Sequence, residues 1–175
     1  EDKRMEIQGV SLAPFVAKLC ESHTLPSTAL TPDSGYHYDE QIGTYSVNMP
    51  FLATILRLAD ILDFDRDRTP EVLLKSIHFT SNVSLGEWEK HRSVEGWYIS
   101  VDLVRYTVRC SHPAYEKAVR QYMDWIDQEL LAAKEINRSM PRGIEGYDIN
   151  LPSNVDRSRI GPANGAYRYH DLEFV

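Results

Sequence analysis

The chain has 175 residues, of which 42% are hydrophobic and 26% are charged, and its formal net charge is −7. This composition is that of an ordinary globular protein with one domain, or one domain and a further piece. The negative charge argues against a nucleic-acid surface as the main design, although it leaves room for a local basic groove. No apolar run reaches the ~18 residues needed to span a membrane.

The two cysteines, Cys20 and Cys110, form no CxxC pair and no disulfide framework. We therefore expect a reducing cytoplasm, with each cysteine acting as a small buried hydrophobic residue. Residues 1–10 do not resemble a signal peptide, and the chain starts at Glu1 rather than Met. The expectation is an internal fragment of a longer protein.

Helical spacing of apolar residues predicts a first helix over Val10–His23, with Pro14 in its first turn. His23 stands at the C-terminal end of this helix. A protonated histidine there interacts favourably with the helix dipole. The alternative is a histidine that contacts a metal ion or a phosphate. The sequence leaves both interpretations of His23 open.

The segment Thr24–Met49 reads as a long connection that carries His37 among three tyrosines. Long loops are often functional lids or mobile segments. Aromatic side chains and a histidine beside a site can stack on a base or a sugar, which makes His37 a candidate substrate-binding residue. We favour the other interpretation, in which these aromatic side chains pin the loop to the core.

The stretch Pro50–Pro70 contains a helix that is apolar on nearly all sides, which predicts burial at the centre of a domain. Arg57, Asp60 and Asp63 nevertheless lie three residues apart on one stripe of it. A buried carboxylate is costly unless it is paired or binds a metal ion. The partner of Asp60 is either Arg57, one turn back, or a metal ion with further ligands from elsewhere.

Alternating charges follow this helix over Asp63–Arg68. The favoured interpretation is a solvated helix end. The alternative is that Arg66 and Arg68 reach a phosphate as forked donors.

Period-two alternation predicts a small antiparallel sheet built from residues near 76–81, 97–103 and 105–110. The phase of the alternation changes at Val104, which fits a bulge or a tight reversal. Between the first two strands, Ser84 and Glu87 have the spacing of a capping box and predict a short helix that ends near His91.

A continuous apolar stripe predicts the longest helix over Pro113–Arg138, with Arg120 and Asp124 as an outward i,i+4 ion pair. Glycine and proline then divide Met140–Val175 into turns. We expect a linker there with two short strands, Tyr147–Leu151 and Tyr167–Phe174.

The string LRLADILDFDRDRTP resembles the last metal-ligand helix of HD-domain metal-dependent phosphohydrolases. In that superfamily an aspartate on a late core helix completes a site begun by an earlier histidine and a His-Asp dyad. Asp60 matches that aspartate. AKLCESH looks like the helix after the dyad, whose final histidine faces the site, and His23 matches it. GEWEKHRSVEGW, HPAYEKAV and MDWIDQEL extend a resemblance to bacterial proteins that join an HD domain to an Hsp90-like ATPase.

The resemblance implies a mainly α, HD-like helical body with a small antiparallel sheet appended, α+β overall. It divides the chain into 1–69, the C-terminal part of the HD-like domain, 70–140, an α+β extension, and 141–175, a linker that leads to a following domain. The implied activity is hydrolysis of a nucleotide or another phosphoester with a divalent metal (Mn, Mg, Fe or Zn). Asp60 and His23 would be metal ligands and catalytic residues, and the candidate substrate-binding residues are Arg57, Asp63, His37 and Arg66.

No His-Asp dyad precedes the helix in Pro50–Pro70. We do not assign the role of the dyad to His170-Asp171, which lies near the C-terminal end of the sequence. Two ligands are too few for a catalytic metal site, so we expect the chain alone to be inactive. Three interpretations stay open: a piece of an enzyme, a regulatory module coupled to a following ATPase domain, and a structural or interaction domain in which Asp60 pairs with Arg57. Neither a membrane nor a nucleic acid is indicated as a partner.

Overall fold

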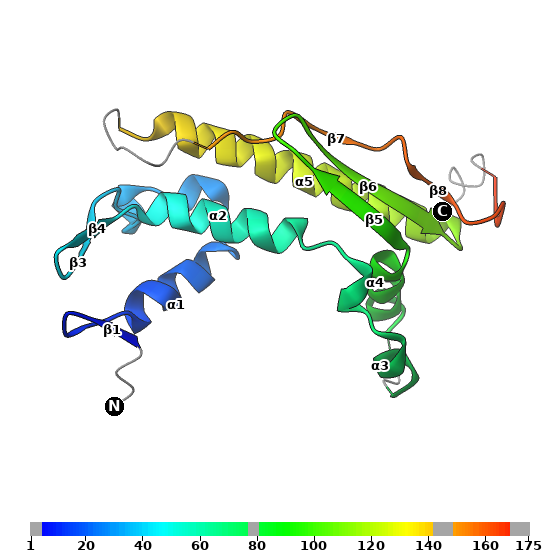
Figure 1. The fold of residues 1–175 in the computed structure, drawn as a ribbon, viewed down its shortest axis with the longest axis horizontal. Coiled ribbons are helices and arrows are strands. Elements are labelled where there is room, and N and C mark those ends of the chain that lie inside the picture. Colours follow the sequence, from blue (N-terminus) through cyan, green and yellow to red (C-terminus); the bar gives the residue numbers. More distant parts are fainter. Residues whose placement is uncertain (1–4, 77–80, 142–148, 169–175) are drawn as a thin grey trace. The chain divides into compact units, whose positions relative to one another are not determined.

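The computed structural model describes residues 5–76, 81–141 and 149–168 (Figure 1). Two compact units divide the chain. Unit 1 comprises Glu1–Ile61 and Leu131–Asn150, and unit 2 comprises Leu62–Leu130 and Leu151–Val175. These boundaries follow spatial compactness and differ from the domain boundaries proposed above, which stay a prediction.

The described part of unit 1 consists of two hairpins, two α-helices, two 3-10 turns and the last part of α5. In chain order the elements are β1 (Glu6–Ile7), β2 (Val10–Ser11), α1 (Ala13–Ser22), η2 (Ser27–Ala29), η3 (Pro32–Ser34), β3 (Glu40–Ile42), β4 (Tyr45–Val47) and α2 (Met49–Leu62). The last residue of α2, Leu62, is counted in unit 2. The prediction of a helix from Val10 was wrong at its start, because Val10 and Ser11 pair with β1.

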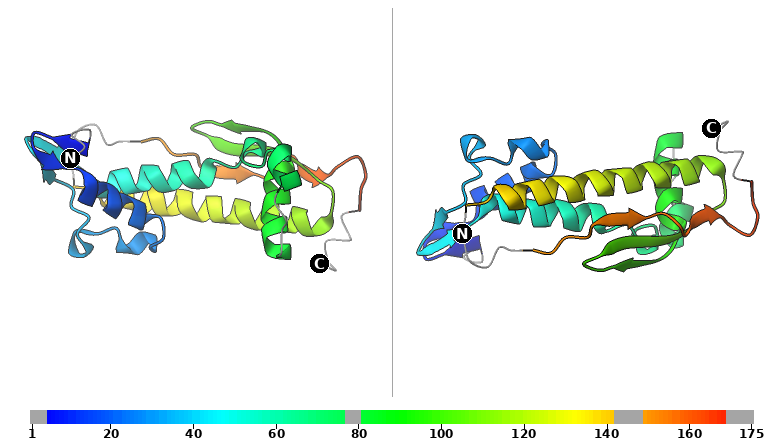
Figure 2. Two further views of the ribbon diagram at one scale, coloured as in Figure 1. Left: turned by 90° about the horizontal axis from the view of Figure 1, so that it is seen from below. Right: turned by 90° about the horizontal axis from the view of Figure 1, so that it is seen from above.

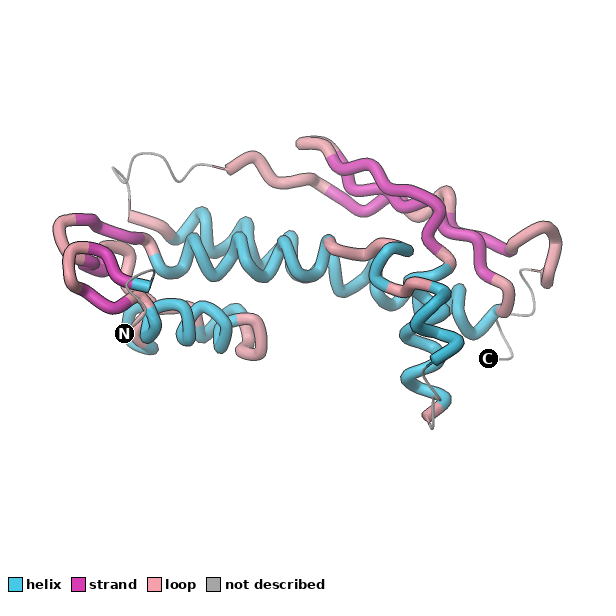
Figure 3. Tube along the Cα trace, turned by 60° about the horizontal axis from the view of Figure 1, so that its bottom comes forward, coloured by secondary structure: helices cyan, strands magenta, loops and turns pink. Residues whose placement is uncertain are grey.

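The two hairpins of unit 1 are joined by Gln8. Its amide donates to Thr44 Oγ1 and accepts from the Thr44 N–H, both at 2.9 Å. Figure 3 shows the hairpins side by side. The segment between α1 and α2, expected to be a long loop, therefore contains the ordered hairpin β3–β4.

The core of unit 1 centres on the buried residues Leu30, Tyr36, Met49 and Ala53. Tyr36 comes from the segment between α1 and α2 and is only 1% exposed. The prediction that aromatic side chains pin this segment to the core is confirmed for Tyr36, whereas Tyr45 is exposed.

Helix α2 is buried on one face only. The buried positions are Met49, Pro50, Ala53, Thr54 and Leu58. Ile55 and Leu56 are 39% and 37% exposed, and Asp60 is exposed as well. The prediction that this helix is buried all round was therefore wrong, because its buried residues follow a single stripe at helical spacing.

Unit 2 contains the sheet, two short helices and most of α5. Its elements are η4 (Arg66–Arg68), α3 (Glu71–Ser76), α4 (Asn82–Arg92), β5 (Val94–Ile99), β6 (Leu103–Cys110), α5 (Pro113–Ser139), β7 (Asn154–Asp156) and β8 (Ile160–Pro162). Strand β5 pairs antiparallel with β6, and β7 and β8 both pair parallel with β6. Figure 2 shows α4 crossing α5. The predicted α+β class is confirmed, and β5 and β6 form the antiparallel part of a mixed sheet.

The first predicted strand of the sheet is replaced in part by helix. Ser76 ends α3, residues 77–80 lie outside the described residues, and Ser81 is the N-cap of α4. The Ser81 hydroxyl accepts from the Val83 N–H at 3.2 Å. The predicted capping box at Ser84 was therefore displaced by one turn from the true start of the helix.

The β5–β6 reversal lies at residues 100–102, before the phase change at Val104. The Ser100 hydroxyl accepts from the N–H groups of Asp102 and Leu103 at 3.2 and 3.3 Å, which closes the turn. Val104, Tyr106, Val108 and Cys110 on β6 are buried in alternation, as predicted. Extending the first strand through residue 103 was wrong.

Ion pairs hold the C-terminal strands on unit 2. Arg157 binds Asp124 at 2.7 Å and Asp127 at 2.6 Å on α5. Arg105 on β6 binds Asp156 on β7 at 2.6 Å. The strands predicted over 147–151 and 167–174 were wrong at 149–151 and 167–168, and their other residues, His170-Asp171 included, lie outside the described residues. The predicted Arg120–Asp124 pair was also wrong, because Arg120 pairs with Glu116.

Candidate functional site

His23 is the C-cap residue of α1, and its side chain is exposed. Its Nδ1 bonds to the carbonyl oxygen of Cys20. A carbonyl oxygen can only accept, so Nδ1 carries the proton. In a neutral imidazole the lone pair is then on Nε2, the nitrogen that stays available to a metal ion or to a donor on a ligand.

Arg57 on α2 contacts the turn that contains His23. Its Nη1 donates to the carbonyl oxygens of Ser22 at 2.7 Å and Leu25 at 2.6 Å. The last carbonyl groups of a helix have no partner within the helix and carry partial negative charge. A guanidinium, which is always charged, suits them well. Both acceptors flank His23 in sequence, so α2 is anchored directly to the His23 turn.

Asp60 follows Arg57 by one helical turn, and these two residues share a side of α2. Arg57 contacts the His23 turn from the side of α2 on which Asp60 also lies. Asp60 is exposed, so the argument that burial forces it to find a partner was wrong. An exposed carboxylate is hydrated and needs no counter-ion. Its role as a metal ligand stays a prediction.

His23 and Asp60 are too few to hold a resident metal ion on their own. His23 offers an imidazole nitrogen and Asp60 a carboxylate, donors that divalent Mn, Fe and Zn accept. Within residues 5–76, 81–141 and 149–168, however, no group of three or more His, Cys, Asp and Glu side chains is placed to hold a metal ion. The described residues offer at most a part of a metal site.

A groove of about 650 Å³ lies along α1 and includes Leu25 of the His23 turn. Its other lining residues are Pro14, Ala17, Lys18, Glu21, Ala29, Ser34 and Tyr36. The Tyr36 hydroxyl donates to the Lys18 carbonyl at 3.1 Å. Burial raises the pKa of Tyr36, nearby Glu21 adds to the rise, and Arg57 opposes it. Glu21, Tyr36 and Arg57 therefore influence one another electrostatically where the groove meets the His23 turn.

His37, a candidate substrate-binding residue, lies near the opposite end of α2. Its carbonyl accepts from the Met49 N–H at 3.0 Å. A helix rises about 1.5 Å per residue, which puts Met49 roughly 16 Å along the axis from Asp60. The structure does not bring the His37 backbone to the Asp60 end of α2. Its role in substrate binding stays a prediction.

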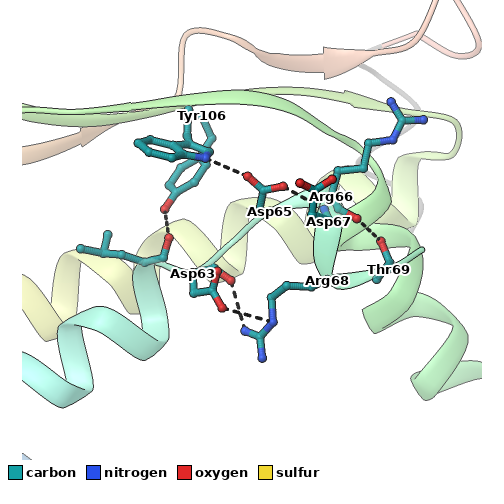
Figure 4. Close-up of polar contacts among 9 residues, drawn as sticks. Asp63, Asp65, Arg66, Asp67, Arg68, Thr69 and Tyr106 are labelled. Atoms are coloured by element: carbon teal, nitrogen blue, oxygen red, sulfur yellow. Dashed lines mark hydrogen bonds and ion pairs between the residues drawn. The ribbon is translucent and has the colours of Figure 1, made fainter. Parts of the chain in front are cut away.

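Asp63 and Arg66, the other candidates, belong to unit 2. Asp63 Oδ2 lies 3.5 Å from Arg68 Nε, and the Asp63 carbonyl accepts from Arg68 Nη1 at 3.1 Å. In Figure 4 the Arg66 side chain points away from this pair. Arg66 and Arg68 are therefore not arranged as two converging phosphate donors, although binding by Asp63 or Arg66 stays a prediction.

Two polar contacts of unit 2 were missed from the sequence. Asp65 accepts from the Asp67 N–H and from the Trp97 indole N–H, both at 2.8 Å (Figure 4). The hydrogen bond from the Asp67 N–H is the main cause that lowers the pKa of Asp65. An aspartate that can bond to the backbone two residues on was a signal for this turn. Which acceptor an indole N–H finds cannot be read from sequence.

The buried Glu116 carboxylate and its two donors were also missed from the sequence. Glu116 is 0% exposed, accepts from Arg120 Nε at 2.8 Å and accepts from the Tyr167 hydroxyl at 2.5 Å. Cys110 nearby is also fully buried, and burial raises its pKa to about 11. The prediction of a buried cysteine is confirmed for Cys110 and was wrong for Cys20, which is exposed.

Comparisons with known proteins give one result. A family model described as HD-CE matches residues 1–132. No curated protein and no solved structure matches the chain. In the described ranges, no helix is both long enough and apolar enough to cross a membrane. The chain is an HD-related module and belongs to the HD-CE family.

Proposed function

We propose that this chain is part of a metal-dependent phosphohydrolase that acts on a nucleotide or another phosphoester. The observation that supports this proposal is the bond from Arg57 to both carbonyl groups beside His23. It links the turn that carries His23 to the helix that carries Asp60, and these are the two residues that the HD resemblance implies as ligands. The further ligands would come from outside the described residues.

The groove along α1 supports the same proposal, because it gives a ligand a place next to the His23 turn. Its apolar side chains suit the face of a base or another organic group, and Lys18 and Glu21 supply one charge of each sign. Binding sites commonly combine apolar walls with a few polar groups in this way. In this proposal the groove holds the organic part of the ester while the phosphate lies at His23.

The first test measures metal binding without turnover. Manganese added to the isotope-labelled chain should broaden the NMR signals of His23 and Asp60 before those of other residues. His23→Ala and Asp60→Ala should each reduce the broadening at the other residue. Asp39→Ala removes an exposed carboxylate elsewhere in unit 1 and should leave it unchanged. Broadening that is equal in all variants would contradict a shared site.

The second test measures phosphate released from a panel of nucleotides. We expect none from this chain alone, and turnover by a longer natural protein that contains it, abolished by Asp60→Ala. Turnover by the chain alone that Asp60→Ala abolishes would show that the ligand count is wrong. Inactivity of a longer protein that has an intact His-Asp dyad would contradict the proposal and favour the second candidate.

The second candidate is a regulatory module coupled to a following Hsp90-like ATPase domain. The observation that favours it is the continuity of α5, one helix that contributes residues to both compact units. A continuous helix can transmit a change from one unit to the other. In a longer protein, Leu131→Pro at the point where the units divide should abolish any effect of nucleotide on the ATPase rate, because proline breaks a helix.

A further inference from the structure

A single nitrogen of Arg57, Nη1, donates to two main-chain carbonyl groups. Nη1 carries two N–H groups, and the two carbonyl oxygens that it reaches, those of Ser22 and Leu25, lie on either side of His23 in sequence. Hydrogen bonds from a charged donor are stronger than neutral ones. The guanidinium therefore fixes both ends of the short segment that carries the histidine.

Other hydrogen bonds of this segment run to α1 itself. The Thr24 and Leu25 N–H groups donate to the Glu21 and Ser22 carbonyls at 3.0 and 3.3 Å. His23 Nδ1 donates to the Cys20 carbonyl one turn back. Such a C-terminal turn frays readily when its carbonyl groups have no partner. Arg57 supplies those partners from a different helix.

We infer that Arg57 is a positioning residue for His23. By holding the Ser22 and Leu25 carbonyl groups, it keeps the His23 ring bonded to Cys20 through Nδ1 and leaves Nε2 exposed as the ligating nitrogen. Arg57 thus acts on the site through His23, while its own role in substrate binding stays a prediction. In treating His23 as a functional group the inference rests on the proposed function, but the tautomer that it requires can be measured without metal or substrate.

The decisive measurement is the His23 tautomer, read from long-range ¹H–¹⁵N NMR spectra of the whole chain at pH 8. His23→Gln identifies the signal among the six histidines. In the unsubstituted chain we expect the proton on Nδ1. A histidine side chain that is free in water prefers the proton on Nε2, so Arg57→Ala should shift the population toward that form. Amide exchange at Thr24 and Leu25 should also accelerate, by roughly tenfold or more, because two bonds to a charged donor are lost.

Two matched variants separate positioning from general stability. Arg57→Lys keeps a charged donor at the end of a side chain of similar length and, compared with Arg57→Ala, should restore the Nδ1–H form in part. Arg138→Ala removes an exposed arginine elsewhere in unit 1 and should change neither the tautomer nor the exchange rates. A tautomer that Arg57→Ala leaves unchanged would overturn the inference.

The inference also fails without any variant if His23 in the unsubstituted chain carries its proton on Nε2. It therefore stays testable even if Arg57→Ala does not fold. Failure of the proposed function has a different signature: manganese would leave His23 and Asp60 signals unbroadened while the Nδ1–H tautomer and its dependence on Arg57 persist.

Discussion

The indole N–H of Trp97 donates to the carboxylate of Asp65 across 2.8 Å. This bond ties the segment after α2 to β5, although the Trp97 side chain is 58% exposed. The same carboxylate accepts from the Asp67 N–H and caps the 3-10 turn η4. The Asp65 side chain therefore both caps the start of η4 and attaches this segment to the sheet of unit 2.

Asp65→Ala should lower the free energy of unfolding by about 1–2 kcal/mol, because it removes a cap and an indole partner together. Trp97→Phe removes only the indole bond and should cost less. Asp65→Asn keeps a side-chain oxygen for the cap, so its loss of unfolding free energy should lie between those of Trp97→Phe and Asp65→Ala. Urea unfolding followed by circular dichroism measures all three, and an unchanged midpoint in Asp65→Ala would show that the contact contributes nothing to stability.

The free energy of unfolding should depend on pH through His91. The centroid of its ring lies 5.0 Å from the centroid of the Phe64 ring. Its Nδ1 is buried with no hydrogen-bond partner among the described residues. Burial is the main cause that lowers the pKa of His91 from 6.5, and the positive charges of Lys90 and Arg68 lower it further. Glu87 and the backbone of Asp65 act in the opposite direction.

The sign of this effect follows from the lowered pKa. Above about pH 6.5 the ring is neutral in both states, and its contribution to stability is complete. As the pH falls, the unfolded chain takes up the proton first. Stability is lost until the pH passes below the pKa of the folded state. His91→Phe should flatten the change in urea midpoint between pH 7.5 and 5.5, whereas His37→Gln, at an exposed histidine, should keep it. Equal slopes in all three proteins would contradict the assignment to His91.

Elements whose signal lies within their own residues were predictable from the sequence. The apolar stripe of α5 gave its start at Pro113 and its end to within one residue. The alternation of β6 gave its buried face. Strands β7 and β8 have three residues each and exist through parallel pairing with β6. Such pairing depends on partners that are distant in the sequence, so a local pattern does not show it.

The candidate site divides in the same way. The placement of His23 at the end of α1 and of Arg57 one turn before Asp60 followed from helical spacing. The exposure of Asp60 did not, because hydropathy counts apolar residues but does not say which neighbours cover them. The sequence also did not predict that Arg57 binds the Ser22 and Leu25 carbonyl groups, because every residue has a carbonyl acceptor.

Removal of the Glu116 carboxylate should be among the most damaging polar substitutions in unit 2. Glu116→Ala removes the buried carboxylate that accepts from Arg120 and from the Tyr167 hydroxyl, and losing these bonds, one of them to a charged donor, should cost about 2–4 kcal/mol. Glu116→Gln keeps one acceptor oxygen and should cost less. Tyr167→Phe removes the hydroxyl that donates to Glu116 but leaves the carboxylate and its bond from Arg120, so it should cost about 1 kcal/mol. If Glu116→Ala proves no worse than Tyr167→Phe in urea unfolding, the ion pair with Arg120 is not a source of stability.

The two faces of α2 should respond differently to the same substitution. Leu58 is 6% exposed, and Leu58→Ala should cost about 2–5 kcal/mol, because it removes a buried side chain and leaves a cavity. Ile55 and Leu56 are 39% and 37% exposed. Ile55→Ala and Leu56→Ala give up much less buried area, and each should cost less than about 1 kcal/mol.

The comparison depends on the orientation of α2 rather than on its helix propensity. All three substitutions introduce alanine at interior positions of one helix, where alanine is the most favourable residue, so propensity slightly favours every variant. Residues 56 and 58 are both leucine, so Leu56→Ala removes the same atoms as Leu58→Ala and is its direct control. Chemical unfolding of the three variants beside the unsubstituted chain gives the answer. Equal losses of unfolding free energy in Leu56→Ala and Leu58→Ala would contradict the assignment of Leu56 to an exposed face of α2.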